Sequence, residues 1–547
     1  MTQFECVTEV FDDVLDEAGG SSCSLIGSID QGTSSTRFLV FTKNGRIAAS
    51  SQMEHTQIFP HGHAGWHEHN PVELWENTIT CMMSVVRALK ASKFAIDLSK
   101  DPLKAIGITN QRETTIAWNL KTGKPYYNAI VWDDLRTVAV AESIGEKDSM
   151  REQTGLPLRS YFAGTKVRWL IDNISDLRKD LMHEDNHKNV RFGTVDSWLV
   201  YQLTGTKSSF EGAANVGGQV MTDVSNASRW LFLNLHTMKW DQDLIDRVCH
   251  GSGVCLAAYC LPEIKSSSGI FGHCATNFGI PELEGVCIAG ILGDQQAALF
   301  GQCAFHSGEA KNTYGTGLFL MMNTGDKPVP STNGLLTTVA YQLKGQEAMF
   351  ALEGSVSHSG STIQWLRDQL GIIRNASESE TLASEVDSNE GLYFVPAFSG
   401  LFAPYWRSDA RACILGMTAS HTKHHICRAA LEATTYQTND VFEAIENDSK
   451  VYLKELRVDG GGTANRLLMQ FQADITNVPV VKPIVKETTS LGAAFAAGLA
   501  VGVFKDLEEI RNLWQEEERF VPNMTEQERE SLCKGWKKAI EKSMGWE

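Results

Sequence analysis

The sequence predicts an α/β protein made of two duplicated lobes, and three observations support this fold class. The 547 residues exceed what one hydrophobic core normally holds, which favours two large lobes. Apolar stretches typical of buried strands alternate with helical patterns. A strand, a Gly-Thr turn and a second strand occur in "SIDQGTSSTRFLVFTKNG" and again in "KNTYGTGLFLMMNTGDKP". We expect each repeat to begin one lobe, so that the two turns face each other across a central cleft.

The composition excludes several classes of protein. The net charge is −17, which argues against nucleic acid or an anionic membrane as a partner. No apolar run reaches the roughly 20 residues that a membrane-spanning helix needs. The 12 cysteines are scattered without a CxxC pair, which favours reduced thiols over disulfides or zinc. We therefore expect a cytoplasmic location, and loose attachment to an organelle surface is the alternative.

The N-terminus "MTQFECVTEVFDDVLDEAGGSS" is acidic and lacks the basic end and apolar centre of a secretory signal. It is also too acidic for a typical mitochondrial presequence. We expect residues 1–23 to form a short flexible extension, residues 24–302 an N-terminal lobe and residues 303–547 a C-terminal lobe.

The first Gly-Thr turn follows a strand that ends on Asp30. Its backbone N–H groups and hydroxyls suit phosphate oxygens, a carboxylate beside them can hold Mg²⁺ through water, and Arg37 adds a fixed cation. The alternative is an ordinary hairpin in which Asp30 caps its own turn. Taken by itself, the turn slightly favours the ordinary hairpin. The similar turn at Gly315-Thr316-Gly317 favours the interpretation as a phosphate-binding turn.

The elements that follow can be predicted in order. Asn44-Gly45 predicts a hairpin turn, and a helix is expected from Pro71 onward, with Asn70 as its cap and Glu73 completing a capping box. "LKAIGIT" predicts a buried strand, and "TTIAWNL-KTGKP-YYNAIVW" another hairpin. Near the C-terminus, "KELRVDGGGTANRLLMQFQADI" predicts a strand, a glycine turn and a helix. "TTSLGAAFAAGLAVG" predicts a helix of small residues that can pack close to a neighbour.

Two further motifs carry candidate catalytic side chains. In "GILGDQQAALFG", Asp294 opens a helix after a buried strand, where it could accept a proton from a hydroxyl or serve as a plain N-cap. In "ITNQRETT", Arg112 and Glu113 offer donors and an acceptor for a small polyol, although such pairs are more often surface ion pairs.

Other chemistries find less support. His61, His63, His67 and His69 match no standard metal-ligand spacing, so we expect a solvated loop. There is no Walker A sequence, no HRD or DFG triplet and no GxSxG elbow.

Taken together, the motifs resemble those of glycerol kinases in the FGGY carbohydrate kinase family. The resemblance runs from about Leu25 to the C-terminus, and it is carried by "DQGTSSTR", "GITNQRETT", "NAIVW", "YFAGTKVRWL", "GTVDSWLVYQLTG", "GDQQAALFGQ", "KNTYGTG", "IQWLRD", "APYW", "RVDGG" and "LGAAFAAGLAVG". It implies two lobes of the actin and hexokinase type, with ATP and glycerol in the cleft between them. The implied reaction transfers phosphate from ATP to glycerol with Mg²⁺, the N-terminal lobe binding glycerol and phosphate and the C-terminal lobe the nucleotide. We also expect a homodimer.

The resemblance also assigns roles to individual residues. Asp294 is implied as the general base and Asp30 as the carboxylate near Mg²⁺. The implied glycerol-binding residues are Arg112, Glu113, Tyr161, Asp294 and Gln295, with Trp132 and Phe319 packing on the glycerol carbons. The implied nucleotide- and phosphate-binding residues are Thr33, Ser34, Ser35, Arg37, Thr316, Gly360, Gln364, Gly461 and Asn465.

The sequence departs from the bacterial members of the family in a few places. Phe402 stands where bacterial members have glycine and eukaryotic ones tend toward a bulky aromatic, which favours the eukaryotic type. The segment "FGHCATNFGIPELEG" lacks the arginine of the bacterial loop that binds fructose 1,6-bisphosphate, so inhibition by that sugar is not expected. Two other functions stay open: another FGGY sugar kinase such as a pentulose kinase, and a non-catalytic ATP-binding protein of the same fold.

Overall fold

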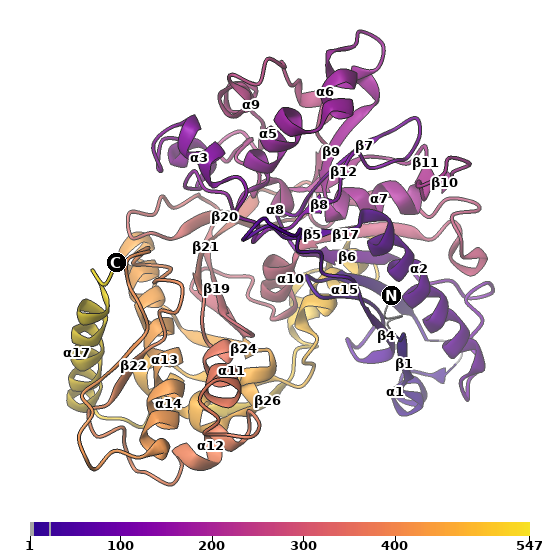
Figure 1. Ribbon diagram of the computed structural model, residues 1–547. Coiled ribbons are helices and arrows are strands. Elements are labelled where there is room, and N and C mark those ends of the chain that lie inside the picture. Colours follow the sequence, from indigo (N-terminus) through magenta and orange to yellow (C-terminus); the bar gives the residue numbers. More distant parts are fainter. Residues whose placement is uncertain (1–4, 21–22) are drawn as a thin grey trace. The chain divides into compact units, whose positions relative to one another are not determined.

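The chain divides into two compact units in the computed structural model, which describes residues 5–20 and 23–547 (Figure 1). The first unit comprises Met1–Cys303, Thr338–Met349 and Glu487–Leu513. The second comprises Ala304–Thr337, Phe350–Lys486 and Trp514–Glu547. Residues 338–349 and 487–513, which the sequence alone places in the C-terminal lobe, thus pack with the first unit.

A seven-stranded sheet forms the core of the first unit. β2 pairs with β3 antiparallel and with β6 parallel, and β6 pairs with β17 parallel. Apolar side chains of these strands and of α2 fill the core, which includes Ile29, Phe38, Ile108 and Ile291. In sheet order, the strands are β1 (Val7–Val10), β4 (Ile47–Glu54), β3 (Ser35–Thr42), β2 (Leu25–Gln31), β6 (Ile106–Asn110), β17 (Cys287–Gly293) and β16 (Ile270–His273).

The remaining elements of the first unit surround this sheet. A four-stranded sheet contains β5 (Glu68–His69), β8 (Ala129–Ile130), β7 (Thr115–Asn119) and β9 (Val190–Thr194). The helices are α1 (Asp12–Glu17), α2 (Pro71–Ala91), α3 (Val138–Ile144), α4 (Arg151–Thr154), α5 (Ala163–Asn173), α6 (Ser175–Met182), α7 (Val195–Thr204), α8 (Val224–Ala227), α9 (Gln242–Cys249), α10 (Asp294–Gly301), α15 (Thr488–Ala500) and α16 (Leu507–Arg511). Three two-stranded pieces are β10 (Thr206–Lys207) with β11 (Asn215–Val216), β12 (Met221–Asp223) with β15 (Glu263–Lys265), and β13 (Leu233–Asn234) with β14 (Lys239–Trp240).

Part of the segment expected to be a flexible extension has regular structure. β1 pairs with β4 from Val7 opposite Gln52 to Val10 opposite Ala49, and α1 follows it directly. Residues 1–4 and 21–22 lie outside the described residues. The strand adds to the edge of the central sheet because its backbone groups find partners on β4.

Helix α2 begins as the sequence predicts, with one exception. The Asn70 side chain accepts a hydrogen bond from the Val72 amide at 2.9 Å, and Pro71 occupies the first turn. Glu73 does not complete the predicted capping box. Its carboxylate instead accepts hydrogen bonds from the amide and hydroxyl of Thr56, which anchors the chain after β4 to the start of the helix.

The small-residue helix α15 packs closely against α10, as the sequence predicts. A side chain at Gly301 would meet the backbone of α15, and one at Gly492 would meet the backbone of α10. This contact explains why Glu487–Leu513 belongs to the first unit although it lies late in the chain.

The second unit repeats the sheet of the first. β18 pairs with β19 antiparallel and with β24 parallel, and β24 pairs with β25 parallel. These relations match those of β2 with β3 and β6, and of β6 with β17, so the predicted duplication is confirmed. In sheet order, the strands are β20 (Leu336–Gln342), β21 (Ala348–Val356), β19 (Leu318–Gly325), β18 (Glu309–Tyr314), β24 (Glu455–Asp459), β25 (Val480–Pro483) and β26 (Glu516–Phe520). β20 from Thr338 onward and the first two residues of β21 are assigned to the first unit.

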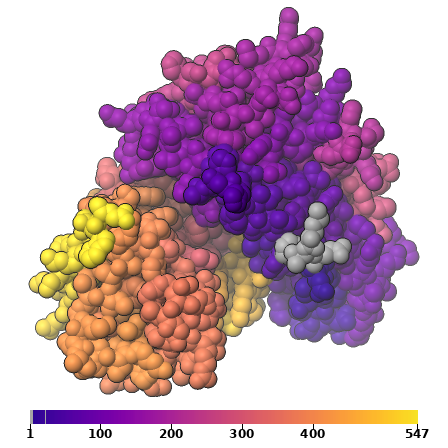
Figure 2. Space-filling model, viewed as in Figure 1, coloured from indigo at the N-terminus to yellow at the C-terminus, as the bar shows by residue number. Residues whose placement is uncertain are grey.

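Helices cover the sheet of the second unit. They are α11 (Gly360–Asp368), α12 (Glu378–Ala383), α13 (Lys423–Ser449), α14 (Arg466–Thr476) and α17 (Glu526–Ser543), and β22 (Tyr393–Val395) pairs with β23 (Cys413–Leu415). Figure 2 shows the C-terminal segment, in yellow, at the surface of this unit. Trp536 of α17 is buried and donates a hydrogen bond to Asp440 of α13 at 2.7 Å, which fixes the last helix. No helix among the described residues is long and apolar enough to cross a membrane.

Candidate active site

Three neighbouring parallel strands of the first unit end at the same edge of its central sheet. Gln31 of β2 and Gly293 of β17 both pair with Asn110 of β6. Asp30 therefore lies one residue before this edge, while Arg112 and Asp294 lie just beyond it. The carboxyl edge of parallel strands is where α/β proteins commonly bind ligands.

Arg112 and Asp294 form an ion pair across this edge. Nε of Arg112 lies 3.1 Å from Oδ1 of Asp294, and Nη1 donates to Oε1 of Gln296 at 3.3 Å. Gly293 is the N-cap of α10, so Asp294 occupies the first helical position, and the amide of Gln295 donates to its Oδ1. The Asp294 side chain is about one-third exposed (32%), whereas Arg112 is buried, so the carboxylate is held in place and still accessible.

Glu113 is buried and pairs with a second arginine. Nε of Arg229 donates to Oε1 of Glu113 at 2.5 Å, and both side chains are buried. The backbone of Glu113 has φ of 58°, a left-handed conformation that a glutamate adopts only where the surroundings hold it. The interpretation of Arg112 and Glu113 as a surface ion pair is therefore wrong.

Two aromatic rings line the same region. Trp132 and Tyr161 meet edge to face with ring centroids 5.6 Å apart, and the Arg229 guanidinium lies 5.7 Å from the Tyr161 ring. Lys166 is fully buried and donates to the carbonyl of Tyr161 at 2.7 Å. Burial lowers the Lys166 pKa to about 8, and the nearby Glu113 carboxylate opposes this shift.

The turn between β2 and β3, residues 32–35, is called the Thr33 turn below. The Trp132 indole donates to the Thr33 hydroxyl at 2.9 Å, so the turn contacts the aromatic pair directly. Ser34 is exposed, while Ser35 begins β3 and is buried. Arg37 pairs with Glu487 at 2.6 Å, which holds the predicted cation beside the turn.

Asp30 precedes this turn and is buried. Its Oδ2 accepts a hydrogen bond from Ser490 of α15 at 2.7 Å, so the alternative in which it caps its own turn is wrong. Burial raises the Asp30 pKa, and the Arg37 charge opposes that shift. No cluster of three or more His, Cys, Asp or Glu residues in the described part of the chain could hold a metal by itself. A hard oxygen ligand such as Asp30 fits Mg²⁺, which keeps most of its waters and takes phosphate oxygens as further ligands.

The expected solvated histidine loop is only half correct. His61 and His63 are exposed, but His67 and His69 are buried. The His69 ring meets the His67 ring and also that of His55, a residue outside the four predicted histidines. Gln57 links their rings because its side-chain oxygen accepts from both His67 and His69.

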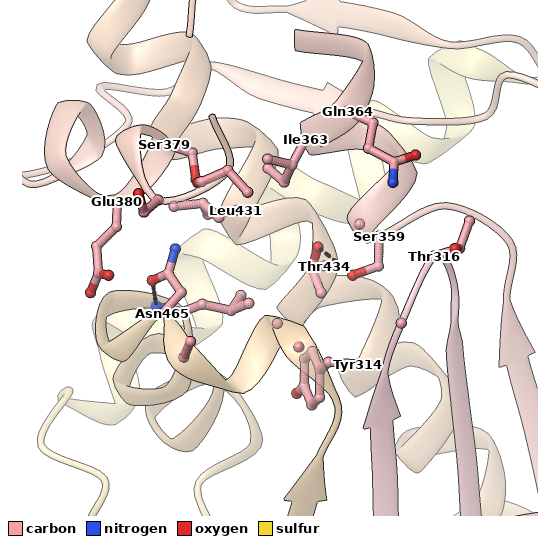
Figure 3. A pocket seen from close by; sticks show the side chains of 18 of the residues that line it. Tyr314, Thr316, Ser359, Ile363, Gln364, Ser379, Glu380, Leu431, Thr434 and Asn465 are labelled. Carbon is pink, nitrogen blue, oxygen red and sulfur yellow. Dashed lines mark hydrogen bonds between the residues drawn. The ribbon is translucent and has the colours of Figure 1, made fainter. Parts of the chain in front are cut away.

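A pocket of about 500 Å³ lies entirely within the second unit (Figure 3). Its apolar lining includes Ile363, Leu431 and Leu468, and its polar lining includes Ser379 and Glu380. The five predicted nucleotide residues of this unit all line it: Thr316, Gly360, Gln364, Gly461 and Asn465.

Two capping arrangements shape this pocket. Asn465 caps α14 by accepting from the Leu468 amide at 2.8 Å, and Glu380 of α12 accepts from the Arg466 amide at 2.8 Å. The turn 315–317 is fixed from the other side, because the amides of Ser359 and Ser361 donate to the Thr316 carbonyl. Glycine at 461 leaves the backbone open to a ligand, since nothing lies near the position of a side chain there.

The structure thus groups the predicted residues in two sets. Those of the first unit lie around the carboxyl edge of its sheet, and those that line the pocket lie in the second unit. Phe319, predicted with the glycerol residues, is on β19 of the second unit. Arg229, Lys166 and His55 were not predicted. The sequence feature that could have indicated a buried, paired Arg229 is its position directly before the apolar run "WLFL".

The sequence patterns of a known family cover most of the chain. The N-terminal domain of the FGGY family of carbohydrate kinases matches residues 25–301, and the C-terminal domain of that family matches residues 310–501. The chain therefore belongs to the FGGY family of carbohydrate kinases.

Individual relatives are similar to this chain over almost its whole length. The chain is 51% identical to the glycerol kinase of Brucella anthropi, over 95% of this chain and 99% of that protein. It is 50% identical to glycerol kinase 1 of Streptomyces avermitilis, over 95% and 97% respectively. The crystal structure of Plasmodium falciparum glycerol kinase with ADP matches with a TM-score of 0.84 and 36% identity, over 95% of this chain and 98% of that one. A xylulose kinase from Lactobacillus acidophilus, at 21% identity, shares the fold.

Proposed function

We propose that this chain is an ATP-dependent glycerol kinase that produces sn-glycerol 3-phosphate and ADP. The observation that carries the proposal is the set of Arg112, Glu113 and Asp294 at one sheet edge, two buried and one accessible. Such a set offers donors and acceptors for the hydroxyls of a small polyol. Identity near 50% to proteins named glycerol kinase, over almost their whole length, supports this substrate.

Asp294 is the proposed general base. It accepts the proton of the attacking hydroxyl as that oxygen bonds to the γ-phosphorus, and the bond from this phosphorus to the ADP oxygen breaks. Arg112 holds the carboxylate through the 3.1 Å ion pair, so that its orientation does not depend on the substrate. Phosphoryl transfer relies mainly on such positioning and on charge stabilisation.

The remaining first-unit residues have complementary roles in the proposal. Glu113, held by Arg229, and Gln295 pair with the other hydroxyls, and Tyr161 and Trp132 cover the carbon chain. Phe319 is proposed to pack on the same carbons. Thr33, Ser34, Ser35 and Arg37 bind phosphate oxygens.

The second unit is proposed to bind the adenosine part of ATP. The pocket combines apolar side chains with Gln364 and Asn465 and carries few charges, which suits a neutral base and ribose. Thr316 lies on a turn equivalent to the Thr33 turn and is proposed to bind phosphate. Asp30 would hold Mg²⁺ through water, and the ion would supply positive charge to the phosphates of ATP.

Three assignments are extensions of this proposal. A cytoplasmic location is supported by the 12 cysteines, which all lie among the described residues and are all free. A homodimer remains a prediction that light scattering would test. The domain roles, glycerol and phosphate in the first unit and nucleotide in the second, would be tested by truncated ligands.

A coupled ADP-release assay tests the proposal. Glycerol, dihydroxyacetone, xylulose and ribulose would be compared at equal concentrations, with Asp294→Asn as the matched inactive control. Glycerol should give the highest kcat/KM. Preference for a pentulose would identify another FGGY sugar kinase, and tight ATP binding without ADP release on any polyol would identify a non-catalytic protein.

A further inference from the structure

The carbonyl groups of Gly32, Thr33 and Ser34 in the Thr33 turn all accept hydrogen bonds from residues outside the turn. The Gly32 carbonyl accepts from the Gln111 side chain at 3.0 Å, and the Ser34 carbonyl accepts from the His55 amide at 3.2 Å. The Thr33 carbonyl accepts two hydrogen bonds, from Nε2 of His55 at 2.7 Å and from Nε2 of Gln57 at 3.1 Å.

Two successive amides in the middle of the turn are in the opposite situation, whereas the Gly32 amide donates to the Ser35 carbonyl at 2.9 Å. No residue in the described part of the chain accepts a hydrogen bond from the Thr33 or Ser34 amide. A turn whose carbonyls are occupied and whose successive amides are available has the polarity of an anion-binding nest. Holding the carbonyls therefore determines which face of the turn meets a phosphate.

His55 can donate to Thr33 only when its Nε2 carries a hydrogen. A carbonyl oxygen accepts and never donates, so Nε2 of His55 carries the hydrogen. The ring is buried, and burial lowers its pKa, which favours the neutral form. Its Nδ1 has no hydrogen-bond partner among the described residues, so the bond to Thr33 is the one polar contact of this ring.

The second donor to Thr33 is fixed by a longer chain of hydrogen bonds. The Gln57 amide nitrogen also donates to the His55 carbonyl at 3.1 Å, which points its oxygen toward His67 and His69. The other nitrogen of His67 lies 2.8 Å from Asp133. Asp133 directly follows Trp132, whose indole holds the Thr33 hydroxyl, so the turn is attached to this segment at two points.

We propose that His55 is a positioning residue for phosphoryl transfer, which holds the Thr33 carbonyl so that the turn presents its amides to the phosphates of ATP. The inference rests on the proposed function, because it takes the Thr33 turn as the phosphate-binding turn. It goes beyond that function by assigning a role to a buried histidine that does not itself touch substrate.

A purely structural role makes a different prediction. The His55 ring packs edge to face on His69 with centroids 4.6 Å apart, so its aromatic volume could by itself explain its presence. His55→Phe keeps this ring and removes the donor. His55→Gln removes the ring and keeps an N–H at a similar distance from the backbone. The two variants therefore separate hydrogen bonding from packing.

Steady-state kinetics with each substrate varied in turn provide the test, together with the dissociation constant of MgATP from calorimetry. His55→Phe should weaken MgATP binding and raise the KM for ATP roughly five- to ten-fold, the effect of one net hydrogen bond, while the KM for glycerol stays within about two-fold. His55→Gln should restore the ATP values to within about two-fold of the wild type. The proposal is overturned if both variants raise the KM for ATP equally, or if the KM for glycerol changes more than the KM for ATP.

Two controls keep the result interpretable. If His55→Phe does not fold by thermal melting, Gln57→Met removes the other donor to the same carbonyl and should show the same ATP-selective defect. If the wild type releases ADP with no polyol, the proposed function fails, yet the MgATP dissociation constant still tests His55. An unchanged constant in folded His55→Phe would then overturn this inference on its own.

Discussion

Nε of Arg229 donates a 2.5 Å hydrogen bond to Oε1 of Glu113, and both side chains are buried. The two residues are 116 positions apart in the chain. A buried ion pair of this kind is costly to break on one side, because the remaining charge loses its partner. Glu113 thus comes to the sheet edge with its carboxylate already oriented.

Glu113→Gln should raise the KM for glycerol roughly ten-fold or more. The amide keeps the shape but weakens the pair with Arg229 and supplies one acceptor oxygen in place of two, and about 1.4 kcal/mol corresponds to a factor of ten. The KM for ATP should change little. Kinetics with each substrate varied in turn decide this, with exposed Glu184→Gln as the matched control. If both constants rise, or the ATP constant alone, Glu113 does not bind glycerol.

Asp294→Asn should lower kcat by roughly 10²–10⁴-fold while MgATP binding is retained. The reason is that the amide cannot accept the hydroxyl proton, and this is the usual contribution of a positioned general base. Rapid-quench measurement of phosphoryl transfer checks the loss of turnover, and calorimetry with MgATP checks that binding is retained. A folded variant with near-normal turnover would remove Asp294 from this role.

Fructose 1,6-bisphosphate at millimolar concentration should not inhibit the enzyme. The segment 271–285 contains no lysine or arginine and carries Glu282 and Glu284, so it offers like charge to a bisphosphate. Initial rates over a range of the sugar phosphate test this, with glycerol subsaturating. Saturable inhibition would show that the chain binds the sugar phosphate at another site.

Much of the fold and of the site follows from local sequence. The Thr33 and Thr316 turns, the Asn70 cap and the small-residue helix could be predicted because each depends on residues close in the chain. The placement of Asp30, Arg112 and Asp294 at one sheet edge follows from one rule, that parallel strands end at a common edge. Their proposed roles come from the motif resemblance.

The features that the sequence did not predict depend on distant partners. Arg229 acquires its role from Glu113, and His55 from the carbonyl of Thr33, a backbone group that no residue pattern marks. His67 and His69 look solvated in a polar loop, yet Gln57 brings them into the interior. The assignment of Glu487–Leu513 to the first unit likewise depends on packing between α10 and α15.

The buried carboxyl group of Asp196 makes stability depend on pH in a specific direction. It accepts hydrogen bonds from Thr194 and Thr222 at 2.6 Å each, and burial raises its pKa to about 7. In the unfolded chain an aspartate titrates near 3.9, so between about pH 4 and pH 7 the folded state binds more protons. Stability from this group is complete below that window and is lost as the pH rises through it.

Asp196→Asn removes this dependence, because the amide stays neutral and the threonine hydroxyls can rotate to suit it. We expect the melting temperature of the variant, relative to the wild type, to rise from pH 5 to about pH 7 and to level off above it, where Asp196 is ionised in both the folded and the unfolded state. The full difference corresponds to a few kcal/mol by linkage. Differential scanning fluorimetry in buffers of constant ionic strength measures it, with exposed Asp185→Asn as the control. A difference between variant and wild type that stays constant with pH would mean that Asp196 is ionised in the folded protein throughout, and that its two threonine partners offset the cost of burying the charge.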